Sequence, residues 1–90
     1  MRPEKTIRVA NKDVRVKTER HAGHRFKVTA TAPDGTTAEV RLTLGPANGP
    51  GASGGLSKQQ LQRAVDRARE KAANTAAYRS QVAELESEID

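Results

Sequence analysis

Residues that could do chemistry are few in this chain, and their spacing assembles no catalytic site. His21 and His24 are the only histidines, and the nearest acid to them is Glu19. Two imidazoles alone do not make a zinc site, since zinc takes three or four protein ligands. The chain also has no cysteine. We therefore expect no resident metal or cofactor and no thiol chemistry.

The carboxylates predict no general acid–base chemistry. They stand beside basic residues or gather near the C-terminus at Glu84, Glu86 and Glu88. Catalysis needs a carboxyl group held in a pocket close to the reacting proton, which a solvated helix end does not supply. The segment 45–55, GPANGPGASGG, lacks the Gly-Lys-Ser/Thr that follows a phosphate-binding loop. We read it as a flexible linker, and we expect no catalysis.

The formal net charge of +5 is concentrated in the first half of the chain. Residues 1–45 hold ten Lys and Arg against five Asp and Glu, whereas residues 46–90 hold six of each. A basic surface attracts nucleic acid, acidic proteins or membranes, but the same charges also solvate the wet face of a sheet. No apolar run is long enough to cross a bilayer, and the N-terminus lacks a signal-peptide core. We expect a cytoplasmic protein without a membrane partner.

Residues 5–44 alternate between apolar and polar types, which predicts antiparallel strands with one buried face. We expect the first two strands to join at Asn11-Lys12, with Val9 opposite Val14. Pro33-Asp34-Gly35 predicts a three-residue hairpin between the last two strands, because glycine accepts a positive φ. The predicted inner face is aliphatic plus Phe26, and the predicted outer face carries Arg8, Arg15, Lys17, Arg25, Lys27 and Arg41.

The stretch from Leu56 onward predicts one long amphipathic helix. Ser57 is a good N-cap and Gln60 completes a capping-box pattern. No Gly or Pro follows, so about 33 residues can run as ~50 Å of helix, while an eight-residue strand spans only ~27 Å. We expect a sheet to cover about half of the helix, docking on a stripe formed by Leu61, Ala64, Val65 and Ala68. Beyond it, a possible partner edge consists of Tyr78, Val82, Leu85 and Ile89.

Together these patterns predict an α+β fold with a four-stranded antiparallel β-sheet, a Gly-rich linker and a long C-terminal α-helix. The boundaries are residues 1–45 for the β subdomain, 46–55 for the linker and 56–90 for the helical segment.

The order of these segments resembles the substrate-binding region of DnaK-type chaperones, the seventy-kilodalton heat-shock protein family. Val14 to Leu44 is similar to that family's late strands, an "HVTA" strand, a polar turn and an "ITI" strand, and Gly54 to Leu85 is similar to its "SGLS" motif and the start of its helical lid. The residues of this chain that stand at the positions of these motifs are Val14, Val16, Phe26, Val28, Thr29, Ala30, Gly35, Leu42, Leu44, Gly55, Leu56, Ser57, Gln59, Gln60, Leu61, Val65, Arg67, Ala68 and Tyr78.

This resemblance implies a chaperone fragment that helps to bind unfolded polypeptide, with a lid that hinges at Gly54, Gly55 and Leu56. ATP would act only in a larger parent protein, because nothing here resembles the family's nucleotide-binding domain. The chain departs from the family at Lys58, Gln59 and Gln60, where the family has acids, and nothing in it resembles the earlier strands that arch over the peptide. Lid opening would be a shift between docked and undocked states.

Two other functions stay open. A basic sheet-plus-helix module could bind DNA phosphates, although no aromatic side chains stand among the cations for stacking on bases. The residues of that nucleic-acid face are Arg15, Lys17, Lys27 and Arg41. The long helix could instead be a dimerisation element that makes a homo-oligomer.

Overall fold

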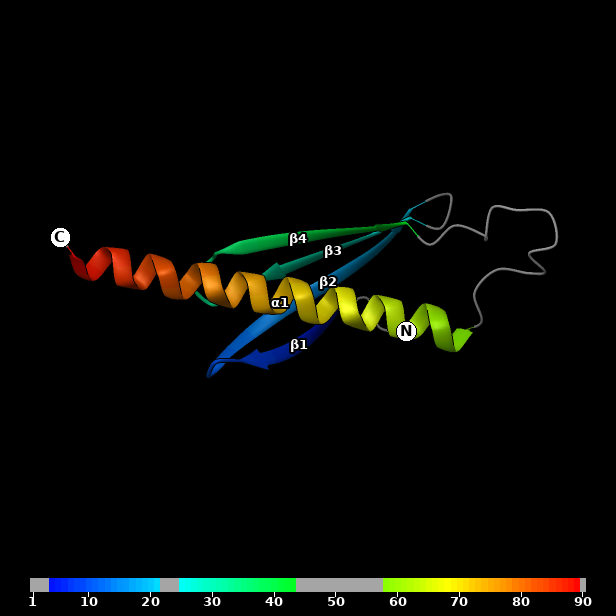
Figure 1. Ribbon diagram of the computed structural model, residues 1–90, viewed down its shortest axis with the longest axis horizontal. Helices are drawn as coiled ribbons and strands as arrows, with labels where there is room; N and C mark the ends of the chain where they lie inside the picture. The colour runs from blue at the N-terminus through cyan, green and yellow to red at the C-terminus, as the bar shows by residue number, and fades with distance from the viewer. Residues whose placement is uncertain (1–3, 22–24, 44–57, 90) are drawn as a thin grey trace.

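The computed structural model describes residues 4–21, 25–43 and 58–89. Within them the elements follow in the order β1 (Glu4–Val9), β2 (Lys12–His21), β3 (Arg25–Thr31), β4 (Thr37–Thr43) and α1 (Lys58–Ile89). Each strand pairs antiparallel with the next, in the order β1-β2-β3-β4, and α1 runs across one face of the sheet (Figure 1). The predicted α+β fold is confirmed.

The turn between β1 and β2 is shorter than the sequence suggested. Ala10 and Asn11 form it with φ values of 50° and 64°, the pair of left-handed residues that closes a two-residue hairpin. Val9 therefore pairs with Lys12, and Ile7 pairs with Val14. The predicted pairing of Val9 with Val14 is wrong by two residues. A shift of two leaves every side chain on its predicted face, so the hydrophobic pattern could not detect the error.

The turn between β3 and β4 is the predicted three-residue hairpin. The Gly35 amide donates to the Ala32 carbonyl at 2.9 Å, and the Ala32 amide donates to the Thr36 carbonyl at 2.8 Å. Gly35 has a φ of 94°, which glycine adopts without strain. The Asp34 carboxylate accepts the Thr36 amide at 2.9 Å and so fixes the turn from within.

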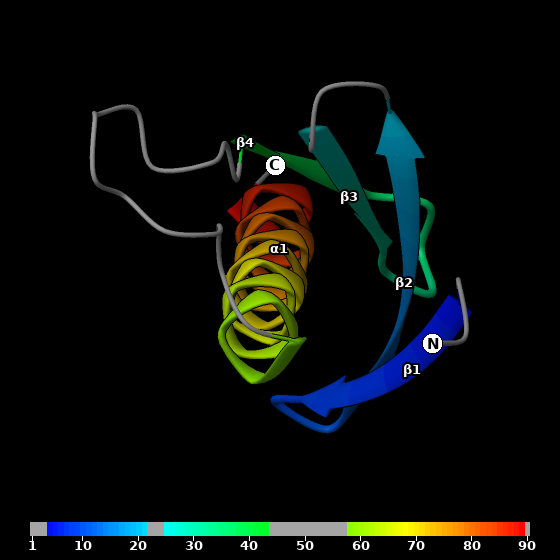
Figure 2. The same cartoon turned by 90° about the vertical axis from the view of Figure 1, so that its right-hand side faces the viewer.

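The core lies between the inner face of the sheet and α1. Figure 2 shows the sheet curving around the helix, with its concave side toward it. Valines dominate on the strands, whereas the helix contributes mainly alanines, which let its backbone come close to the sheet. The core cluster contains Val14, Val16, Val28, Ala30, Ala38, Ala68, Ala72, Ala73, Ala76 and Ala77, with Ile7, Val9, Val40 and Leu42 packed at its margin.

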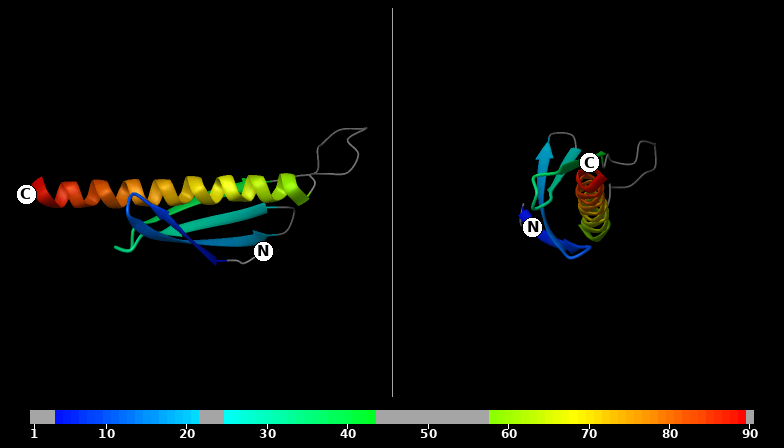
Figure 3. Two further views of the ribbon diagram at one scale, coloured as in Figure 1. Left: turned by 90° about the horizontal axis from the view of Figure 1, so that it is seen from below. Right: turned by 90° about the vertical axis from the view of Figure 1, so that its left-hand side faces the viewer.

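The helix is continuous from Lys58 to Ile89, as predicted, and its contact with the sheet is longer than expected. Buried or half-buried side chains run from Leu61 to Val82. The estimate that the sheet covers about half of α1 was too low. Its assumed strand length was eight residues, whereas β2 has ten. The C-terminal turns still extend past the sheet (Figure 3).

Candidate functional site

The outer face of the sheet carries cations from every strand. The register places Lys27 directly opposite Arg41 and opposite Glu19, and it places Lys17 opposite Thr29 on the same face. Arg15 and Arg41 are exposed, and Lys27 is half-buried. The structure thus brings the four residues of the predicted nucleic-acid face onto one surface. Over the described strands this surface holds six Lys and Arg and four acids: Arg8, Arg15, Lys17, Arg25, Lys27 and Arg41 against Glu4, Asp13, Glu19 and Glu39.

Glu39 is the acid most engaged with these cations. Lys27 Nζ and Arg41 Nε each lie 3.3 Å from its Oε1 atom. Partial desolvation raises the pKa of Glu39, but the hydrogen bonds from Lys27 and then Arg41 outweigh it, and the pKa lies below its usual value. Glu39 therefore stays ionised and neutralises part of the positive charge between β3 and β4.

Glu19 plays a similar part on β2. Its carboxylate lies 3.7 Å from Lys17 Nζ and 3.6 Å from His21 Nε2. Arg15, by contrast, makes no ion pair with any residue that the structure describes. The outer face is therefore a mixture of internally paired cations and at least one guanidinium that is available to an anion.

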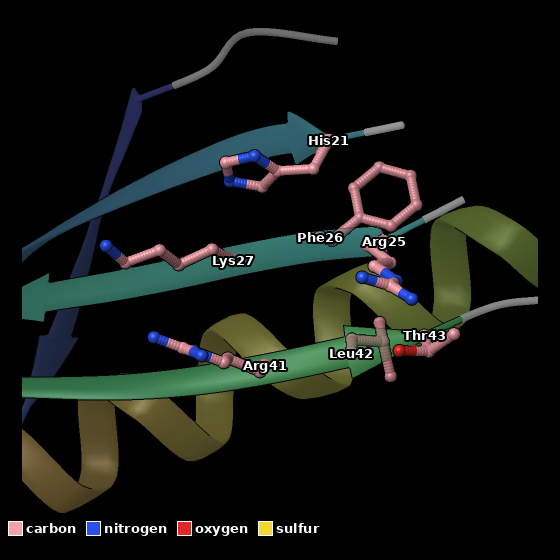
Figure 4. A pocket seen from close by; sticks show the side chains of 7 residues that line it. All are labelled: His21, Arg25, Phe26, Lys27, Arg41, Leu42 and Thr43. Carbon is pink, nitrogen blue, oxygen red and sulfur yellow. The ribbon is translucent and has the colours of Figure 1, made fainter. Parts of the chain in front are cut away.

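The sheet is hollowed at the end where β2 and β4 finish. Among the described residues, an open depression of about 660 Å³ is lined by three cations, one histidine and no carboxylate, together with Phe26, Leu42 and Thr43. Figure 4 shows the side chains of Lys27 and Arg41 extending in the same direction along neighbouring strands, with His21 on the adjoining strand. Three cations on two adjacent strands, with a histidine on a third strand and no acid among the described lining residues, are suited to hold phosphate or carboxylate oxygens. The basic lining residues are His21, Arg25, Lys27 and Arg41.

Phe26 is buried, as predicted, and is 5 % exposed. The guanidinium of Arg20 lies 5.7 Å from the centre of its ring, a distance at which a cation and an aromatic face attract each other. Phe26 therefore closes this end of the core and offers little ring surface for a base to stack on.

The residues predicted for the helix fall into three groups. Val65 and Ala68 of the docking stripe are buried, while Leu61 and Ala64 are half-buried. Of the predicted partner edge, three large side chains are exposed and Val82 is half-buried. The exposed members are Tyr78, Leu85 and Ile89. The predicted hinge of Gly54, Gly55 and Leu56 lies outside the described residues.

Most of the docking surface of α1 lies beyond the predicted stripe. Ala72, Ala73 and Ala76 are 0 % exposed, although none of them belonged to that stripe. The sequence feature that could have identified these alanines is their spacing, because they continue the apolar stripe of the helix at intervals of three and four residues. The prediction relied on the larger apolar residues near the ends of the stripe, whereas close packing of a helix on a sheet favours small side chains.

A polar bridge that joins the two turns to the helix was also missed. Ser80 is 0 % exposed, and its hydroxyl donates to Asp34 Oδ2 at 2.8 Å and accepts from Lys12 Nζ at 3.0 Å. Lys12 also pairs with Glu84. Since Lys12 follows one turn and Asp34 lies in the other, these contacts fasten the C-terminal half of α1 to one end of the sheet.

A second buried polar contact lies nearer the start of α1. Arg69 is 5 % exposed and its Nε donates to the Thr18 hydroxyl at 2.9 Å, while a second guanidinium nitrogen lies 3.3 Å from Asp66. Within the described residues, every buried side-chain nitrogen and oxygen has a hydrogen-bond partner. These polar groups therefore position the helix and do not suggest a site for a bound ligand.

Comparisons with family models, with curated proteins and with solved structures give no match. In the part of the chain that the structure describes, no three His, Asp or Glu side chains come together as metal ligands could. None of the described helix is both long and apolar enough to span a bilayer.

Proposed function

We propose that this chain is a non-catalytic binding module whose outer sheet face holds a polyanion, with the phosphate backbone of a nucleic acid as partner. The observation that carries the proposal is the hollow at the end of a basic face, whose described lining contains His21, Arg25, Lys27 and Arg41 and no carboxylate. Phosphate contacts of this kind need only positive groups at suitable spacing and carry no base sequence. The module would therefore bind without strong sequence preference.

The balance of charge on the outer face determines how tightly it is expected to bind a polyanion. On the outer face of the described strands, six cations stand against four acids, and the Glu39 carboxylate already engages Lys27 and Arg41. Affinity is therefore modest and falls steeply with salt, because each neutralised phosphate releases counterions.

The test is fluorescence anisotropy with a short labelled DNA duplex across a salt series. Lys27→Ala combined with Arg41→Ala is expected to weaken binding roughly tenfold and to lower the salt slope by about 2. Lys5→Ala combined with Arg63→Ala removes the same charge from exposed positions away from the hollow. That control is expected to change affinity less than about twofold. Equal losses in the two double variants, or no binding in low salt, would contradict the proposal.

A second candidate is the handling of unfolded polypeptide, in line with the resemblance to DnaK-type chaperones. The observation that favours it is the alanine-rich docking of α1, which covers the apolar face with small contacts and a few polar bridges. An arm held in this way could lift and expose Val14, Val16 and Val28 to an extended segment. Nucleic-acid binding remains the first proposal because the basic face needs no such rearrangement.

An engineered disulfide separates the two candidates. Asp34 Oδ2 and Ser80 Oγ are 2.8 Å apart, so Asp34→Cys with Ser80→Cys puts one thiol on the β3–β4 turn and the other on the side of α1 that contacts this turn, as a candidate bridge between sheet and helix. The chain has no cysteine of its own to compete. If polypeptide binding requires undocking, oxidation abolishes capture of a reduced, alkylated protein and dithiothreitol restores it. Binding to DNA is expected to be the same in both redox states.

A further inference from the structure

The side of α1 that faces away from the sheet carries an apolar edge in its last three turns. Tyr78, Leu85 and Ile89 are 67 %, 53 % and 82 % exposed. Residues seven and eleven apart lie nearly in line along a helix, since these intervals are close to two and three turns. The buried Ala76 and Ser80 lie on the opposite side, and Figure 3 shows this outward side of α1 uncovered by any strand.

The charges of α1 are arranged against its own macrodipole. Residues 58–73 hold five Lys and Arg and two acids, whereas residues 74–89 hold one Arg and three Glu. The first turn has no acid and the last turn has no base. A helix alone prefers the reverse order, with acids at its start and bases at its end. A neighbouring helix that runs in the opposite direction offsets both ends at once.

Charges on the outward side are free to make such contacts. Arg67, Lys71, Glu86 and Glu88 are exposed, and none of them makes an ion pair within the described residues. Arg67 and Lys71 lie eleven and seven residues before Tyr78, so they continue the line of the apolar edge toward the start of the helix. One outward stripe is therefore basic at its beginning and apolar with flanking acids at its end.

We propose that the partner of this stripe is a second copy of the same chain, packed antiparallel along residues 67–89. A two-fold axis near Tyr78 sets Tyr78 against its counterpart and Lys71 against Leu85 of the second copy. The aliphatic stem of Lys71 then covers Leu85 while its ammonium reaches Glu86. Arg67 meets Ile89 and Glu88 in the same way. This one arrangement buries the apolar edge, pairs the exposed charges that flank it, and sets the two helix macrodipoles in opposite directions.

The two sheets do not obstruct this pairing. Each sheet covers the side of its own helix that contains Val65, Ala72 and Ser80, and the stripe lies opposite. The assembly is a four-layer stack in the order sheet, helix, helix, sheet, with the basic sheet faces outward. Because the contact surface is small, we expect a weak dimer in rapid exchange with monomer.

The first test is sedimentation velocity over a concentration series. Leu85→Glu is expected to abolish association. Lys71→Glu and Glu86→Lys are each expected to weaken it roughly fivefold to tenfold, because each creates like-charge pairs across the two-fold axis. The double variant restores those pairs and is expected to regain the original association. Residues 71 and 86 are four turns apart in one helix, so rescue can arise only between chains.

Arg15→Glu on the outer sheet face is the matched control and is expected to leave association unchanged. All of these positions are exposed, and unchanged circular dichroism checks that each variant folds. A monomer at every concentration, or a double variant no better than the singles, would overturn the proposal.

The second test reads the direction of packing. Lys71→Cys and Leu85→Cys are made in separate chains that have no other cysteine. Oxidising an equimolar mixture is expected to give mainly the mixed dimer, because antiparallel packing places residue 71 beside residue 85. Predominant homodimers of each variant would show a parallel pair and would overturn the register.

Discussion

The two faces of the sheet are made from alternate residues of the same strands, yet they follow different rules. On the inner face, Val14, Val16 and Val28 are at most 1 % exposed, and their shape must fit α1. On the outer face, Arg15 and Lys17 from the same strand point to water, and only their charges matter. The inner face therefore determines whether the chain folds, while the outer face is free to be selected for a partner.

The largest expected effect comes from placing a charge on the inner face. Val28→Asp buries a carboxylate at a site that is 0 % exposed and belongs to the apolar cluster. An unpaired buried charge costs several kcal/mol, which is comparable with the whole stability of a small domain. We expect this variant to be unfolded by circular dichroism. Thr29→Asp, one residue along on the outer face, is expected to fold, and loss of structure in both variants would contradict the comparison.

A smaller effect is expected at a buried alanine of the helix that packs in the core against the sheet. Ala73→Leu adds bulk at a position that is 0 % exposed, and overpacking of this kind costs about 1–3 kcal/mol. Asn74→Leu makes the same helix more hydrophobic at an exposed position and is expected to change stability by less than about 0.5 kcal/mol. Urea unfolding measures both values. If Ala73→Leu were neutral, the alanine contact would be looser than the structure shows.

Alternation and turn chemistry were enough to predict the sheet from the sequence. The faces of Phe26 and Arg15 follow from a period of two, and Pro33-Asp34-Gly35 has only one common way to turn. The β1–β2 register could not be predicted in this way. The predicted pairing of Val9 with Val14 and the observed pairing of Ile7 with Val14 place the same side chains on the inner face. The positive φ of Ala10 and Asn11 decided between them. Asn tolerates this conformation, but alanine rarely adopts it, so the sequence Ala10-Asn11 is a weaker turn signal than one that contains glycine.

The candidate site was predictable only in part. Periodicity placed Arg15, Lys17, Lys27 and Arg41 on one face, but it could not show that an acid-free hollow forms where β3 begins and β4 ends. Ion pairing depends on register across strands, so the contacts of Glu39 with its neighbours appear only in three dimensions. The bridge through Ser80 joins residues 46 and 68 positions apart in the chain, and local patterns carry no such information.

The polar bridge predicts a pH dependence that the apolar part of the inner face lacks. The pKa of Asp34 lies below its usual value, first because its carboxylate accepts hydrogen bonds from the backbone and side chain of Thr36, and then because Ser80 donates to it. The folded pKa is therefore lower than the unfolded one. The ionised carboxylate stabilises the fold above the unfolded pKa of about 4, and this contribution is lost as the pH falls through the folded pKa.

Asp34→Asn removes that titration while keeping the size of the side chain. We expect wild type to have the higher urea midpoint near neutral pH, and the two midpoints to converge below a pH of about 4. Urea unfolding followed from neutral to acidic pH measures the difference. Midpoints that keep a constant separation over this range would show that Asp34 does not stabilise the fold through its charge.

The smallest effect on folding, and the sharpest test of the outer face, is expected at Glu39. Burial raises the pKa of Glu39, but the hydrogen bonds from Lys27 and Arg41 lower it by more, and the net effect is a lowered pKa. The carboxylate is therefore ionised near neutral pH. Glu39→Gln leaves stability almost unchanged, because exposed ion pairs contribute little. It also removes the anion that competes with phosphate for both cations, so affinity for duplex DNA at low salt is expected to rise about twofold to fivefold.

Glu70→Gln removes the same charge from an exposed position on α1 and is expected to raise affinity less. Equal gains in the two variants would mean that net charge alone, and not the arrangement of the outer face, attracts the polyanion.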